Sequence, residues 1–176
     1  MKPYRFLPLL LLVFAATAFS FSSADKGKKD QINWISIEEA DKLNRKQPRK
    51  IVIDIYTDWC GWCKKMDKTT FADEKVAKYV NKHFYAVKLN AETKDDIVLN
   101  GKTYKFNPKY GVNQLAAELL QGKMGYPSTV YLDEKFNMLA PVMGYYDVNK
   151  FISLLHFYGN DHYKKMTYEQ FEASNL

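Results

Sequence analysis

The order of the expected elements in this chain is typical of an α/β fold with a mixed central sheet flanked by helices. Residues 50–56 are β-branched and apolar on both faces apart from one acid, which indicates a buried central strand of the parallel type. Residues 84–89 form a second strand after a long helical stretch. Residues 128–132 and 138–143 form two further strands around a short turn.

The helices of the N-terminal half are bounded by residues that cap or break helices. Ser36 and Glu39 have the spacing of a capping box, which predicts a helix of about ten residues that stops before Pro48. A longer helical stretch runs to about residue 82. We expect it to break at 69–73, where a threonine or an aspartate would cap the second segment.

The C-terminal half alternates turn signals with short helices and strands. Asn100-Gly101 is a strong turn signal and predicts a small hairpin. A helix is expected over 115–120. A further helix begins at Asp147, and a capping box at 167–170 opens a short terminal helix.

The N-terminus has the pattern of an export signal. Lys2 and Arg5 precede an apolar run at 6–15, and the small residues Ala16-Thr17-Ala18 suit signal peptidase, with residues 22–24 as an alternative cleavage site. The apolar run is short for a bilayer span, which favours a cleaved signal peptide. The other interpretation of the run is a retained N-terminal membrane anchor. We therefore expect an exported protein, periplasmic or secreted after cleavage near Ala18.

These features divide the 176 residues into three parts. We expect a signal peptide at 1–18, a flexible leader rich in Ser, Lys and Asp at 19–31, and one domain over 32–176. Apolar residues make up 47% of the chain and aromatic residues 15%, so the domain can build a core without disulfide staples.

The charge does not favour a nucleic-acid partner. The formal net charge is +6, and removal of Lys2 and Arg5 with the signal leaves 24 basic against 20 acidic residues, or +4. Most of the basic residues are scattered among acids rather than gathered on one stripe, which indicates solvated surface.

The two cysteines, Cys60 and Cys63, form a CxxC motif that follows the strand at 50–56 and opens a helix. Unpaired N–H groups and the positive dipole end of the helix favour a thiolate at its first position. Cys60 is therefore expected to attack disulfides. Cys63 lies one helical turn further on, where it can resolve the mixed disulfide.

Other interpretations of a CxxC motif are half of a metal site and an inert local disulfide. Zinc normally takes four ligands, and the chain has neither a second CxxC nor a histidine pair at ligand spacing. Copper held by the two thiolates remains an alternative. The strand–CxxC–helix context favours redox chemistry, with no metal at the site.

Over residues 32–160 the chain resembles thioredoxin and its exported relatives. The resemblance rests on five separated features: Asp54 six positions before Cys60, Trp59-Cys60-Gly61-x-Cys63-Lys64, Lys88-Leu89-Asn90, Tyr126-Pro127-Ser128, and Gly144. It implies a thioredoxin fold, in which the segment at about 91–125 is an insertion before the cis-proline loop.

An acid at position 54 lies among apolar strand residues, where burial of its charge is costly and its pKa should rise. It could then exchange a proton with Cys63. The alternatives are that Asp54 faces solvent at a strand end or that its charge is merely neutralised by Lys88.

The resemblance implies that Lys88 is the partner of Asp54. It also implies that Pro127 follows a cis bond and that Tyr126 presents its backbone to an extended peptide.

The residues around the cysteines are expected to contact substrate. Trp59 packs beside the site, and Gly61-Trp62 helps to set the reduction potential. Trp62 stands where thioredoxins usually have proline, so it restores an N–H and adds an apolar face. That face is either a substrate contact or a lid over the sulfurs.

The resemblance implies a thiol–disulfide oxidoreductase that reduces disulfides of exported proteins through a redox-active Cys60–Cys63 disulfide, without a cofactor. An electron donor, such as a membrane reductant carrier, would recycle the pair. Net oxidation or isomerisation, and a non-catalytic binding or metallochaperone module, are alternatives. The insertion is either a specificity element or a tolerated surface segment.

Overall fold

The computed structural model describes residues 30–174. The expected signal peptide and nearly all of the expected leader lie outside these residues. Between residues 30 and 174, no helix combines the length and the apolar character that crossing a membrane requires.

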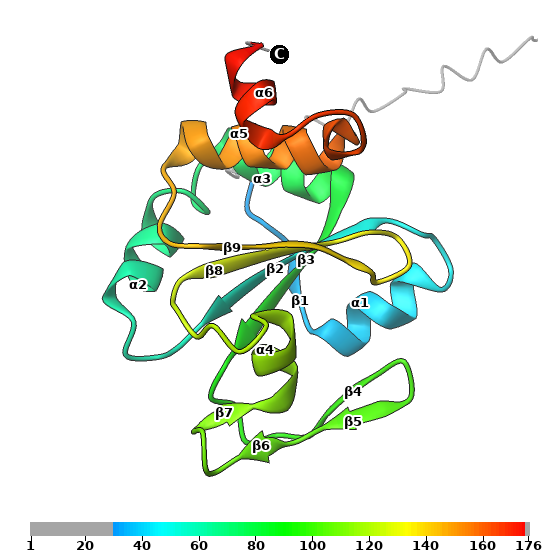
Figure 1. The fold of residues 1–176 in the computed structure, drawn as a ribbon, viewed down its shortest axis with the longest axis vertical. Helices are drawn as coiled ribbons and strands as arrows, with labels where there is room; N and C mark the ends of the chain where they lie inside the picture. The colour runs from blue at the N-terminus through cyan, green and yellow to red at the C-terminus, as the bar shows by residue number, and fades with distance from the viewer. Residues whose placement is uncertain (1–29, 175–176) are drawn as a thin grey trace, which may run out of the picture.

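The centre of the molecule is a five-stranded mixed sheet with the strand order β1-β3-β2-β8-β9 (Figure 1). β2 pairs in parallel with β3 and antiparallel with β8, so it is the central strand. This confirms the predicted fold class. The strands are β1 (Trp34–Ile35), β2 (Lys50–Tyr56), β3 (Phe84–Asn90), β8 (Ser128–Leu132) and β9 (Met138–Met143).

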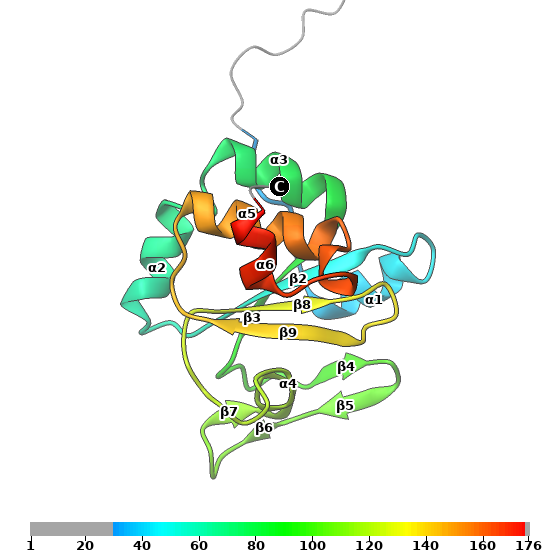
Figure 2. The ribbon, with the colours of Figure 1, turned by 45° about the horizontal axis from the view of Figure 1, so that its top comes forward.

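Helices cover both faces of the sheet, as Figures 1 and 2 show. One core cluster joins β2 to α3, α5 and α6, and the other joins β2 to α1 and to the segment at 91–125, which includes α4. Side chains alternate along β2, so Ile53 belongs to the second cluster and Val52 to the first. The helices are α1 (Ile37–Asn44), α2 (Gly61–Lys68), α3 (Glu74–His83), α4 (Gln114–Leu119), α5 (Val148–Gly159) and α6 (Tyr168–Ala173), with a 3₁₀ turn η1 (His162–Lys164).

The helix starts follow local capping chemistry. Asp73 accepts from two N–H groups at the start of α3, after the expected break, and Asp147 caps α5. Thr167 and Gln170 form a complete capping box at α6. At α1 only half of the predicted box forms, because Ser36 accepts from the Glu39 N–H without the reciprocal bond.

The insertion packs into the core instead of lying loosely on the surface. β4 (Ile97–Leu99) and β5 (Lys102–Tyr104) form the predicted hairpin around Asn100-Gly101, both with positive φ. Ile97 and Tyr104 are buried against the α1 side of the sheet. A second ribbon, β6 (Phe106–Asn107) and β7 (Val112–Asn113), has only two residues per strand, too few for a periodicity signal.

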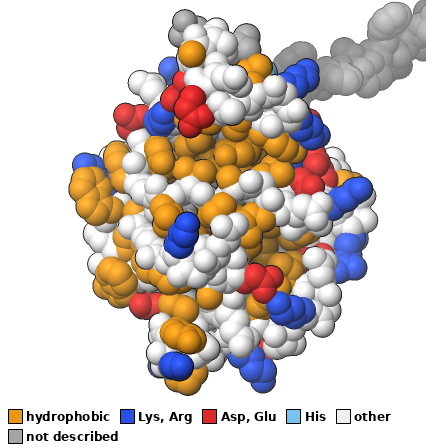
Figure 3. All heavy atoms as spheres, in the orientation of Figure 1, with side chains coloured by type: hydrophobic (Ala, Val, Ile, Leu, Met, Phe, Trp, Pro, Cys, Tyr) orange, Lys and Arg blue, Asp and Glu red, His pale blue; other side chains and the backbone are white. Residues whose placement is uncertain are grey.

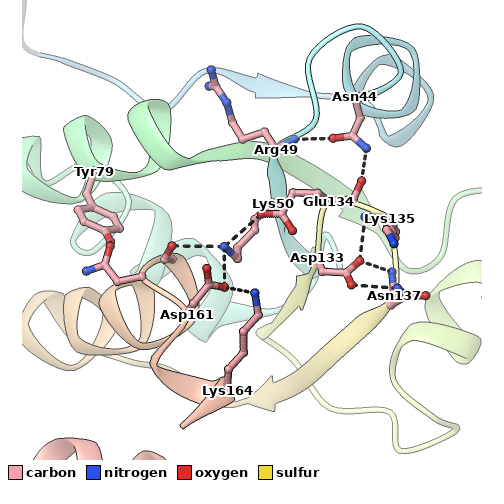
Figure 4. Close-up of polar contacts among 12 residues, drawn as sticks. Asn44, Arg49, Lys50, Tyr79, Asp133, Glu134, Lys135, Asn137, Asp161 and Lys164 are labelled. Atoms are coloured by element: carbon pink, nitrogen blue, oxygen red, sulfur yellow. Dashed lines mark hydrogen bonds and ion pairs between the residues drawn. The ribbon is translucent and has the colours of Figure 1, made fainter.

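Lys50 opens β2 as a buried cation and ties three parts of the chain together (Figure 4). Its Nζ lies 3.2 Å from Glu134 Oε1, in the β8–β9 turn, and 3.0 Å from Asp161 Oδ1, after α5. It also donates to the Gly159 carbonyl at 3.4 Å. The C-terminal segment is thereby fixed to the central strand.

Candidate active site

Cys60 and Cys63 are joined in a disulfide at the start of α2. Cys60 is the N-cap residue, and its Sγ accepts a hydrogen bond from the Cys63 N–H at 3.0 Å. Both cysteines are at most 5% exposed. The Cys63 N–H, one of the free N–H groups of the first helical turn, thus points at the Cys60 sulfur, where it would stabilise a thiolate in the reduced protein.

Asp54 lies on β2, six residues before Cys60 in the chain, and is only 2% exposed. Its Oδ2 lies 3.3 Å from Lys88 Nζ, its register neighbour on β3. Among the described residues, the other carboxylate oxygen has no hydrogen-bond partner. Burial raises the pKa of Asp54 to about 6; Lys88 opposes this shift and the nearby Asp67 carboxylate reinforces it.

Lys88 divides its charge between two carboxylates. Besides Asp54 it pairs with Asp67 on α2, and its ammonium lies over the rings of Tyr56 and Trp34 at 4.9 and 5.5 Å. Sequence reasoning missed Asp67. It follows Cys63 by four residues, which places both on one helix face, and this spacing could have drawn attention to it.

Two exposed tryptophans flank the disulfide. Trp59 is 67% exposed, yet its Nε1 donates to Glu92 at 2.9 Å and its ring lies edge-on to Tyr126 at 5.9 Å. Trp62 is 56% exposed and lies 5.4 Å from the Tyr145 ring. Glu92 and Tyr145 were not predicted, because their contacts join segments far apart in the sequence.

The loop before β8 contains a cis bond between Tyr126 and Pro127. Pro127 accepts from the Gly144 N–H at 2.8 Å, and Gly144 has φ of 108°, a conformation suited to glycine. The Trp59–Tyr126 contact joins this loop to the cysteine loop. Gly61 opens α2, and a Cβ there would meet nothing within 4 Å.

The structure therefore places the expected site residues in two groups. Asp54 and Lys88 lie together in the interior, and Trp59 and Tyr126 lie together at the surface. Trp62 contacts Tyr145 and Lys65 instead of this second group.

Comparisons with known proteins agree with this architecture. The family model Thioredox_DsbH, described as a protein of unknown function, DUF255, matches residues 21–159. A thiol:disulfide interchange protein DsbD from Actinobacillus pleuropneumoniae is 27% identical over 121 residues, which is 67% of this chain. The chain spans only 18% of the length of that relative.

Solved structures show the same fold. A DsbH oxidoreductase is 19% identical, with a TM-score of 0.53 over 74% of this chain and 85% of its own. A thioredoxin from Thermus thermophilus is 18% identical, with a TM-score of 0.55 over 72% and 85%. At these identities the likeness shows the fold alone.

Proposed function

The chain belongs to the Thioredox_DsbH (DUF255) family of thioredoxin-like thiol–disulfide oxidoreductases, and we propose that it reduces disulfides in exported proteins. The observation that carries this proposal is the Cys60–Cys63 pair at a helix N-terminus that directly follows β2, the strand that holds a buried aspartate whose pKa is raised to about 6. A carboxyl group of that pKa is about 90% ionised at pH 7, so it can accept a proton from a thiol there.

The first step is attack by the Cys60 thiolate on one sulfur of the partner disulfide. A mixed disulfide forms between Cys60 and that sulfur, and the other partner sulfur leaves as a thiolate. The Cys63 N–H and the positive dipole end of α2 stabilise the Cys60 thiolate before the attack.

The second step releases the partner. Cys63 gives its proton to Asp54 through an intervening water molecule, and its thiolate attacks Cys60 Sγ. The Cys60–Cys63 disulfide forms, the second partner thiolate leaves, and two electrons have passed to the partner. Lys88 favours the ionised form of Asp54. It neutralises the Asp54 charge only in part, because it also pairs with Asp67.

Substrate contacts come from the surface group around the disulfide. We assign peptide backbone pairing to Tyr126, next to Pro127, and side-chain contacts to Trp59 and Trp62. Gly61 leaves open space between the tryptophans, where a partner chain can approach closely.

The chemistry needs no cofactor beyond the cysteine pair, but it needs a donor of two electrons to restore the thiols. We propose a dithiol protein for that role, such as a membrane reductant carrier. The export pattern at 1–18 and the DsbD relative support a periplasmic or secreted location.

The test is reduction of insulin by the full chain, with Cys60→Ser as the control. We expect Cys60-dependent turnover and a reduction potential near that of thioredoxin, about −270 mV. A potential near the roughly −120 mV of strong oxidants would contradict the reductase assignment and favour oxidation. Binding without turnover would contradict enzymatic reduction altogether.

A further inference from the structure

Most of the exposed large apolar side chains lie near the cysteines in the chain or at one pocket. Trp59 and Trp62 adjoin the cysteines, and Tyr110 and Met124 of the insertion line the pocket. Met143 Sδ would lie 3.4 Å from a Cβ on Gly125, so it covers the loop before Pro127. The exposed set among the described residues is Trp59, Trp62, Val98, Tyr110, Met124 and Met143.

The pocket is a cavity of about 250 Å³ built by the insertion. Its apolar walls are Tyr110 from the β6–β7 turn, Val112 from β7, Ala117 from α4 and Met124 from the loop after α4. Pockets that bind drug-sized ligands have volumes of roughly 300–1,000 Å³, so this smaller cavity suits one large side chain. We call it the Tyr110 pocket.

A stretch of backbone with unpaired N–H groups joins the pocket to the site, although its Gly125 carbonyl accepts from Ser128 Oγ at 2.6 Å. The N–H groups of Met124, Gly125 and Tyr126 make no hydrogen bond to any residue between 30 and 174. Unpaired backbone of this kind can pair with an extended peptide. The stretch begins next to Pro127 and ends at Met124, in the wall of the pocket.

We propose that the Tyr110 pocket binds a large apolar side chain of an extended partner segment, about two to four residues from the partner's reacting cysteine. This rests on the proposed function, because disulfide exchange brings the partner to the face around Cys60, and the pocket continues that face. Figure 3 shows hydrophobic side chains exposed over α2 and, lower on the same face, over the region of β6 and β7.

Charge favours a partner chain over a second copy of this protein. Lys109 lies over the Tyr110 ring at 5.3 Å, and Lys123 adjoins Met124 in the chain. Neither lysine forms an ion pair within the described part of the chain. Two copies joined through this face would bring these lysines together, whereas a partner with acidic residues beside its apolar anchor would neutralise them.

The test uses the full reduced chain and short peptides, each joined through one cysteine to glutathione as a mixed disulfide. In the test peptides a phenylalanine lies two, three or four residues before or after the cysteine. In the matched peptides alanine or aspartate replaces that phenylalanine. We expect at least one phenylalanine peptide to be reduced about tenfold faster than its alanine counterpart. Equal rates across the whole series would overturn the inference.

Two variants locate the preference in the pocket. Ala117→Phe fills the cavity, and Tyr110→Ser removes an exposed wall without touching the core. In each we expect the phenylalanine-to-alanine rate ratio to fall towards one. Val98→Ser is the matched control, since Val98 is 49% exposed in the same insertion but lies outside the pocket.

The outcomes separate this inference from the proposed function. Retention of the phenylalanine preference in both variants would overturn the pocket alone. Reduction of oxidised glutathione, with no preference among the peptides, would also overturn only the pocket. Failure to reduce either glutathione or any peptide would overturn the reductase proposal and the pocket together.

Discussion

Two buried charges lie four residues apart on β2, and their surroundings differ sharply. Lys50 meets two carboxylates and a carbonyl, all within 3.4 Å (Figure 4). Asp54 has one lysine, which it shares with Asp67, and one oxygen without a hydrogen-bond partner among the described residues.

The two charges consequently respond to burial in opposite ways. Burial lowers the pKa of Lys50, but its ion pairs with Asp161 and Glu134 outweigh that effect and raise it, so the lysine stays charged. Burial raises the pKa of Asp54 to about 6, and Lys88 offsets it only in part. A well-paired charge stabilises the fold, whereas an under-paired charge is ready to exchange a proton.

The largest expected effect is on stability when the under-paired acid is removed. The folded-state pKa of Asp54, about 6, lies above the usual 3.8, so its contribution to stability is lost as pH rises through that interval. Asp54→Asn should therefore raise the free energy of unfolding at pH 8 by up to about 3 kcal/mol, and by little at pH 3.5. Urea unfolding at the two pH values measures this; a loss of stability at pH 8 would contradict it.

Removal of Lys50, the well-paired cation, should lower the free energy of unfolding instead of raising it. Lys50→Met leaves Glu134, Asp161 and the Gly159 carbonyl without their shared donor, but both carboxylates are about 40% exposed and regain water. We expect a loss of about 2 kcal/mol in the free energy of unfolding, with the pH profile of turnover unchanged. A shifted pH profile would show that Lys50 also acts on the cysteines.

The smallest expected effect is a shift in the pKa of Asp54 when its neighbour Asp67 is changed. Asp67→Asn removes a nearby negative charge and lets Lys88 serve Asp54 alone, and both changes lower the pKa of Asp54. The inflection in the turnover profile should move to lower pH by less than about one unit, because Asp67 is 40% exposed. An inflection that moves to higher pH would contradict the shared-lysine arrangement.

Sequence reasoning located the parts of the molecule that local chemistry determines. The β-branched run of β2, the capping residues and the turn at Asn100-Gly101 each carry their signal within a few neighbours. It missed β6 and β7, whose two-residue strands are formed by contacts within the insertion and not by any pattern of their own.

The same limit applies to the site. The Asp54–Lys88 pair came from the family resemblance, while the sharing of Lys88 with Asp67 depends on how α2 packs against β3. The ring contacts of Trp59 with Tyr126 and of Trp62 with Tyr145 join segments more than sixty residues apart. Such contacts exist only once the sheet has formed.

The most direct test of the account is the pH dependence of mixed-disulfide resolution in a single turnover. The unmodified protein should resolve faster as pH rises through about 6, where Asp54 ionises, and Asp54→Asn should lose that inflection and slow about a hundredfold at pH 7. The same inflection and rate in Asp54→Asn would contradict proton transfer from Cys63 to Asp54.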